Sequence, residues 1–117
     1  MREIKFERTV WAERQLAKLC PNNDISQIEM LLTTDNFDKQ IGLIIKMIVI
    51  MNEAYERKAH FLDNTHEMNV VTEEELEYLT EKELLELSNK AFADFAEGAK
   101  TEIETTQKKD EAETKSI

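Results

Sequence analysis

The residues of this sequence best suited to chemistry are its two histidines, His60 and His66, with Asp63 and Glu67 close by. A protein zinc site needs three or four ligands that converge on one point. Side chains share a helical face when they are three or four positions apart, whereas these histidines are separated by six. The spacing therefore favours histidines at a helix end or on the surface over a metal site.

The single cysteine, Cys20, is the only candidate thiol nucleophile. A nucleophilic thiol needs a neighbouring base and a group that orients the base. Cys20 instead falls on the apolar stripe of a predicted helix, directly before Pro21, and free cysteines are usually buried. We interpret it as an inert thiol. One cysteine also excludes an intrachain disulfide and a multi-cysteine zinc site, and it favours a reducing compartment.

Four glutamates in residues 73–77 could chelate a hard cation or act as paired acids. Adjacent carboxylates diverge around a helix axis, however, and acidic residues stabilise the positive end of a helix dipole. A solvated helix start is therefore the better interpretation. The two glycines, Gly42 and Gly98, stand alone, so the sequence has no glycine-rich phosphate loop. The sequence predicts no catalytic residue, no cofactor and no metal, and hence a protein that is not an enzyme.

Helices must position these residues, because two glycines and one proline leave few turns for a β-sandwich or barrel. Residues 4–10 alternate closely enough for a short strand or for an extended arm, and both stay open. A helix follows from Thr9 and ends at Pro21. Asp24 then begins a second helix of about nine residues.

A third helix, predicted from Phe37 to Phe61, is the centre of the fold. Between Ile41 and Met51 only Gly42 and Lys46 are not large and apolar, so this helix should be buried on several sides. The apolar run reaches about 17 Å, roughly half of the ~30 Å of membrane hydrocarbon. We therefore expect no transmembrane span and no membrane partner.

The C-terminal third contains two helix starts. Thr72 and Thr80 each precede a glutamate by three positions, which predicts two capping boxes, a short helix Glu73–Leu79 and a longer one from Thr80. The apolar segment Met68–Val71 before them could pair as a strand with the N-terminal arm. After Gly98 apolar residues nearly vanish, which predicts frayed helix or disorder. The expected organisation is one helical domain over 1–98 and an acidic, flexible tail over 99–117.

The predicted fold is therefore mainly α, a compact bundle of four to five helices around the buried central helix. The 117 residues carry a net charge of −10. Residues 1–71 have nine basic and eleven acidic side chains, whereas residues 72–117 have six and fourteen. Nucleic-acid binding is built from clustered lysine and arginine, so this balance argues against it. The chain opens without a charged-then-apolar leader, and we expect a cytoplasmic protein.

One apolar stripe could serve a partner. Most methionine and aromatic side chains should form a single core, but a small helical domain can leave part of a leucine and phenylalanine stripe exposed as a groove. The candidate partner-facing residues are Leu84, Leu85, Leu87, Phe92 and Phe95.

The order of features resembles that of the small α-helical tail assembly chaperones of long-tailed bacteriophages and prophages. The resemblance rests on the helix break Leu19-Cys20-Pro21, on Asn52–Glu56 at the end of the Ile-rich helix, and on the segment Leu79–Leu87 before an acidic tail. It covers about residues 3–97. It implies a non-enzymatic protein that binds the tail tube or tape measure protein before the tail polymerises, and it assigns no site residue.

A second class of function stays open. An acidic helical adaptor or regulator, antitoxin-like or anti-repressor, would cover a basic surface of a protein partner. Such an adaptor should lose affinity steeply above about 0.15 M salt, whereas a groove-based chaperone should lose little. The sequence leaves the oligomeric state open, a homo-oligomer included.

Overall fold

The computed structural model describes residues 3–93, and most of them are helical. The predicted tail over 99–117 lies outside the described residues. No strand occurs within residues 3–93, and none of the helices there is long and apolar enough to cross a membrane. The mainly helical fold predicted from the sequence is confirmed. The helices are α1 (Val10–Lys18), α2 (Ile28–Leu32), α3 (Phe37–Leu62), α4 (Glu73–Glu77) and a further helix over residues 81–93.

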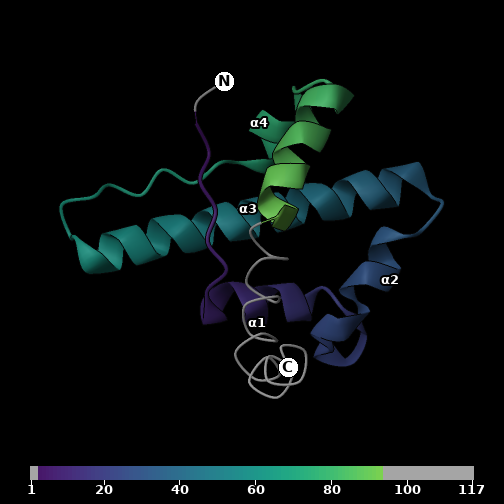
Figure 1. Cartoon of the computed structure of the whole chain (residues 1–117), viewed down its shortest axis with the longest axis horizontal. Coiled ribbons are helices and arrows are strands. Elements are labelled where there is room, and N and C mark those ends of the chain that lie inside the picture. Colours follow the sequence, from purple (N-terminus) through teal and green to yellow (C-terminus); the bar gives the residue numbers. More distant parts are fainter. Residues whose placement is uncertain (1–2, 94–117) are drawn as a thin grey trace, which may run out of the picture.

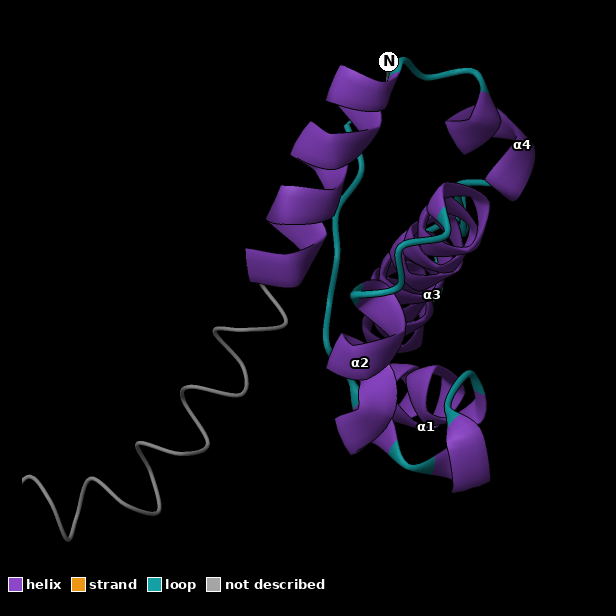
Figure 2. Ribbon diagram, turned by 90° about the vertical axis from the view of Figure 1, so that its right-hand side faces the viewer, coloured by secondary structure: helices purple, strands orange, loops and turns teal. Residues whose placement is uncertain are grey.

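Helix α3 is the middle layer of the molecule. In Figure 2 it is seen nearly end-on, with α1 and α2 on one side and α4 and the 81–93 helix on the other. Its buried side chains point in several directions around the axis, as the long apolar run predicts. The buried residues of α3 are Ile44, Ile45, Met47, Ile48, Met51, Asn52, Ala54 and Glu56.

Helix α1 begins and ends where the sequence places its signals. The Thr9 hydroxyl accepts a hydrogen bond from the Ala12 amide at 3.1 Å, and Ala12 and Leu16 are fully buried one turn apart. After Pro21, Asn22 and Asn23 adopt left-handed backbone angles, which asparagine tolerates better than most residues. The chain therefore reverses there and leads into α2.

Helix α2 is shorter than the nine residues expected. The Asp24 carboxylate accepts bonds from the Ser26 amide at 3.1 Å and the Ser26 hydroxyl at 2.7 Å. This local turn holds Ile25–Gln27 in a 3-10 conformation, and the α-helix starts only at Ile28. The same hydrogen bonds lower the pKa of Asp24, so the turn keeps its charged acceptor at neutral pH.

The N-terminal segment is an extended arm and not a strand. It crosses α3 (Figure 1) and buries Ile4 and Phe6. Its backbone bonds go to α3 and to the last helix: the Glu7 amide donates to the Met51 carbonyl at 3.1 Å, and Lys90 Nζ donates to the Ile4 carbonyl at 3.0 Å. The strand alternative is therefore wrong.

The expected pairing of the arm with Met68–Val71 is wrong as well, and Asn52 explains why. Its side-chain Nδ2 donates to the Lys5 carbonyl at 2.9 Å, and its Oδ1 accepts from the Val71 amide at 2.7 Å. Asn52 is 2% exposed. The buried side chain of Asn52 thus bridges the two segments, and its two hydrogen bonds replace the backbone pairing of strands that was expected between them.

Both predicted capping boxes are present. Thr72 Oγ1 accepts from the Glu75 amide at 3.1 Å while Glu75 Oε1 accepts from the Thr72 amide at 2.9 Å. Thr80 and Glu83 repeat the arrangement at 3.2 and 2.9 Å. Each box satisfies two backbone donors that a helix start would leave free.

We predict that Thr72→Ala lowers the free energy of unfolding by about 1 kcal/mol, because the Glu75 amide loses its acceptor. The Thr72→Ser variant keeps the hydroxyl and should stay within about 0.5 kcal/mol of the wild type. Urea denaturation followed by circular dichroism measures both. Equal losses in the two variants would contradict a capping role for the hydroxyl.

Candidate functional site

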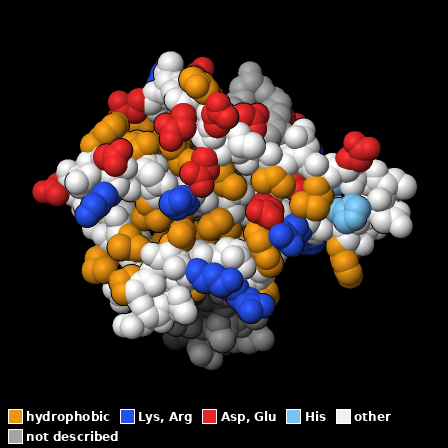
Figure 3. Space-filling view, turned by 180° about the vertical axis from the view of Figure 1, so that it is seen from behind, with side chains coloured by type: hydrophobic (Ala, Val, Ile, Leu, Met, Phe, Trp, Pro, Cys, Tyr) orange, Lys and Arg blue, Asp and Glu red, His pale blue; other side chains and the backbone are white. Residues whose placement is uncertain are grey.

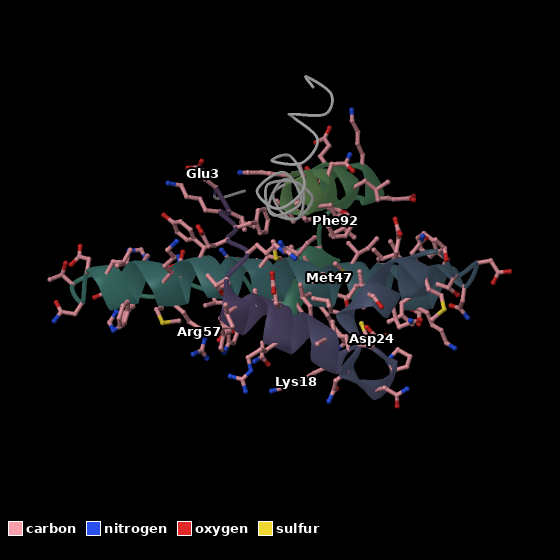
Figure 4. All side chains as sticks on the ribbon, turned by 60° about the horizontal axis from the view of Figure 1, so that its bottom comes forward. Glu3, Lys18, Asp24, Met47, Arg57 and Phe92 are labelled. Carbon is pink, nitrogen blue, oxygen red and sulfur yellow. The ribbon has the colours of Figure 1, made fainter. Side chains whose placement is uncertain are left out.

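The structure describes four of the five residues predicted to face a partner, and it separates them. Leu84 is 5% exposed and belongs to the core, so only a small part of its side chain is accessible to a partner. Leu87 and Phe92 are partly buried against the core, and Figure 4 shows Phe92 between the 81–93 helix and α3. Leu85 is 42% exposed, and Phe95 lies outside the described residues.

The helical period explains this separation. Leu84, Ser88 and Ala91 are buried at spacings of four and three, so they form the stripe that packs on the core. Leu85 is rotated by about 100° from Leu84 and therefore leaves the stripe. Ser88 is polar, and for this reason the apolar pattern alone did not identify the buried stripe.

An open apolar groove lies beside this stripe, and we call it the α3–α4 groove. Ile45, Leu76 and Leu84, all buried, form its floor. Phe37, at the first position of α3, forms a wall and is 60% exposed. The volume of the groove is about 170 Å³. Its lining residues are Phe37, Ile41, Ile45, Leu76, Glu77, Leu79, Thr80, Glu81 and Leu84.

Local structure positions the groove. The Asn36 carboxamide accepts from the Lys39 amide at 3.0 Å, which starts α3 at Phe37 and fixes that side chain at the helix end. The Thr80 capping box starts the last helix immediately after α4, so Leu76, Leu79 and Leu84 come together within a few residues of one another in sequence. The groove is thus built from two helix starts.

The groove has an acidic edge. Glu77 and Glu81 line it and are exposed, and we call them the rim glutamates. In residues 3–93 neither has an ion-pair partner. Figure 3, on the side where α4 lies, shows acidic side chains gathered around exposed hydrophobic ones. Glu73 of α4 lies 3.7 Å from Lys46 with both side chains more than half exposed, so this pair neutralises the edge only weakly.

A second depression adjoins the groove at Leu79. It is lined by Glu83, Glu86, Leu87 and Lys90 together with Leu79, and its volume is about 310 Å³. Leu79 is therefore shared by both hollows. Of the predicted partner-facing residues, Leu87 lines this second hollow and Leu84 lies on the floor of the first.

The histidines hold a loop against α3. His66 Nε2 donates to Glu56 Oε1 at 2.7 Å, and the Asn69 amide donates to the same oxygen at 3.0 Å. The Nδ1 atom of His60 lies 2.8 Å from the His66 carbonyl and carries a proton there, since a carbonyl only accepts. Within residues 3–93 no group of three His, Cys, Asp or Glu side chains is placed to hold a metal ion.

We predict that Glu56→Ala releases the loop over residues 63–71. Two donors lose a charged acceptor, which should cost about 2 kcal/mol and accelerate amide exchange at Asn69. Glu67→Ala, an exposed change in the same loop, is the control and should stay within about 0.5 kcal/mol. Hydrogen exchange measured by mass spectrometry distinguishes the two, and identical profiles would contradict the role of Glu56.

Cys20 has the surroundings of an inert thiol. It is 7% exposed, and its Sγ donates to the Leu16 carbonyl at 3.5 Å. Burial raises the pKa of the Cys20 thiol, and the charge of Asp24 raises it further. The thiol is thus protonated at neutral pH, which is the opposite of an activated nucleophile.

Sequence reasoning missed Phe37, the rim glutamates and the buried polar residues Asn52 and Glu56. Phe37 directly follows the Asn36 cap. A large apolar residue at the start of a helix is exposed to solvent, and this could have identified Phe37 as a candidate binding residue. Asn52 and Glu56 sit one turn apart on the stripe of a very apolar helix, where a polar side chain must find a partner.

No family model matches the chain, and neither the curated proteins nor the solved structures contain a match to it.

Proposed function

We propose that this protein is a non-enzymatic tail assembly chaperone of a phage or prophage, which binds tail tube or tape measure protein in the host cytoplasm before the tail polymerises. The observation that carries the proposal is the α3–α4 groove: an open apolar surface with a buried floor, at which Phe37 is 60% exposed. The identity of the partner rests on the resemblance in the order of sequence elements.

The dimensions and chemistry of the described surface support protein binding over catalysis. Small-molecule sites enclose roughly 300–1,000 Å³ with convergent polar groups. The α3–α4 groove offers about 170 Å³ and an apolar floor. The adjoining depression reaches about 310 Å³, but no histidine or cysteine lines it. The best candidates for acid–base or nucleophilic chemistry, the two histidines and Cys20, are engaged in local contacts away from the groove.

Co-expression tests the proposal. The tail tube and tape measure proteins of the same phage or prophage genome are each produced with and without this chain, and the soluble fraction is measured. We expect at least one of them to shift from the insoluble to the soluble fraction and to co-purify with the chain. If both have the same solubility with and without it, the proposal is wrong.

An acidic adaptor is the second candidate, and the rim glutamates favour it. An adaptor that acts through charge would bind a basic protein surface with affinity that falls steeply with salt. A chaperone that acts mainly through the apolar groove should lose much less affinity than such an adaptor between about 0.05 and 0.5 M salt. Titrating the purified complex over this range therefore distinguishes the two functions.

A further inference from the structure

The α3–α4 groove has no occupant among the described residues, although its floor is continuous with the core. Ile45, Leu76 and Leu84 each reach both the core and the groove. Water therefore meets apolar surface that one or two further side chains could cover, because the groove has about 170 Å³ and an apolar cavity of about 150 Å³ holds one benzene ring.

The charge of each candidate occupant indicates which of them fits beside the rim glutamates of the groove. The part of this chain outside the structure at the C-terminal end, residues 94–117, has seven acidic and four basic side chains and few large apolar ones. A second copy of the chain brings a net charge of −10. Both would place negative charge against Glu77 and Glu81, which is unfavourable. An occupant with lysine or arginine beside its apolar side chains fits the groove.

The shape of the surface favours a helical occupant. Residues 3–93 contain no strand, so this part of the chain offers no sheet edge to extend. The groove instead lies between the start of α3 and the junction of α4 with the last helix. Apolar side chains one turn apart on a helix suit two neighbouring hollows, here the α3–α4 groove and the depression that shares Leu79.

We propose that the α3–α4 groove binds an amphipathic helix of the partner protein, with one or two large apolar side chains inserted over Ile45, Leu76 and Leu84 and with lysine or arginine paired to Glu77 and Glu81. The inference deepens the proposed function and rests on it, since it takes the chain to be a protein-binding module. The apolar anchors supply most of the affinity, and the rim glutamates supply orientation and selectivity.

Designed peptides test this directly. A fluorescent helical peptide with leucine and phenylalanine one turn apart and lysine on both flanks is titrated with the full chain, alongside an isomer with glutamate flanks. We expect the lysine peptide to bind at least about tenfold more tightly at 0.05 M salt, and its advantage to shrink to a few-fold at 0.5 M salt.

Substitutions in the chain test whether the lysine peptide binds at the α3–α4 groove. Phe37→Ala should weaken the lysine peptide by about tenfold or more at both salt concentrations, because an exposed apolar wall is lost without opening the core. The double variant Glu77→Lys, Glu81→Lys should weaken it by about tenfold at low salt only. The matched control is Glu29→Lys with Glu67→Lys, two exposed glutamates away from the groove with the same charge change, and it should stay within about twofold.

The groove proposal is overturned if neither peptide binds, if both bind equally, or if the control pair weakens binding as much as the rim pair. Its failure is distinguishable from failure of the proposed function. If the groove variants still solubilise a tail protein, the chaperone function stands and the groove is not its site. If the wild type solubilises neither tail protein but the peptide results hold, the groove stands and the chaperone function falls.

Discussion

Replacing Asn52 with alanine should lower the free energy of unfolding by about 3 kcal/mol. The Val71 amide, in a residue 1% exposed, would lose its acceptor, and the Lys5 carbonyl would lose its donor. An unsatisfied buried group such as the Val71 amide costs about 1–3 kcal/mol, and the partly buried Lys5 carbonyl adds a smaller loss. Urea denaturation followed by circular dichroism and by the fluorescence of Trp11, which stacks 4.3 Å from the Arg57 guanidinium, measures the loss.

The loss should appear in two distant places at once. Asn52 ties the N-terminal arm and the segment before α4 to the same turn of α3, so hydrogen exchange should accelerate at residues 4–7 and at residues 69–72 together. The control is Asn64→Ala, an exposed asparagine in the loop after α3, which should leave both segments unchanged. Acceleration confined to one segment would contradict the bridge.

The Asn52→Asp variant tests the same bridge through the pH dependence of its stability. A neutral carboxyl group can donate to the Lys5 carbonyl and accept from the Val71 amide, but the ionised group can only accept. The ionised form is therefore disfavoured in the folded state, and the pKa of the introduced group rises above its unfolded value of about 4. Relative to the wild type, this variant should be nearly as stable at about pH 4 and should lose stability as pH rises toward 7.

The helix limits were predictable from the sequence because they depend on neighbours in the chain. Pro21 ends the first helical segment, and Thr72 and Thr80 start the last two through bonds to residues three positions away. The central helix was equally predictable, since Ile41–Met51 has too much apolar surface for one face. Each of these elements is determined either by contacts between residues close in the sequence or by a long apolar run.

The sequence did not predict which side of each element is buried, because burial depends on contacts between residues far apart in the sequence. Whether the arm is a strand depends on Asn52, which lies 47 positions from Lys5. Whether Leu84 faces a partner or the core depends on α3, more than twenty positions before it. The groove has the same origin: Phe37 starts α3 and Leu79 lies in the bend after α4, and only the fold brings these distant positions together.

Ile48→Ala should be the most destabilising single change in the core, with a loss of about 3–4 kcal/mol. Ile48 is fully buried near the middle of α3. Removal of a buried isoleucine leaves a cavity and also loses the transfer free energy of the deleted atoms. Domains of this size have about 5–14 kcal/mol of stability, so the variant should fold but unfold at a much lower temperature.

Ile50→Ala is the matched control, because Ile50 is the same side chain two positions on and only partly buried. Its loss should be roughly half as large, since less surface leaves water and the site can relax. Equal losses would contradict the unequal burial of these two positions of α3. Neither residue lines the α3–α4 groove, so at temperatures where both variants are folded they should bind the lysine-flanked peptide within about twofold of the wild type. A Phe37→Ala variant that loses binding while these two keep it would separate recognition at the groove from stability of the core.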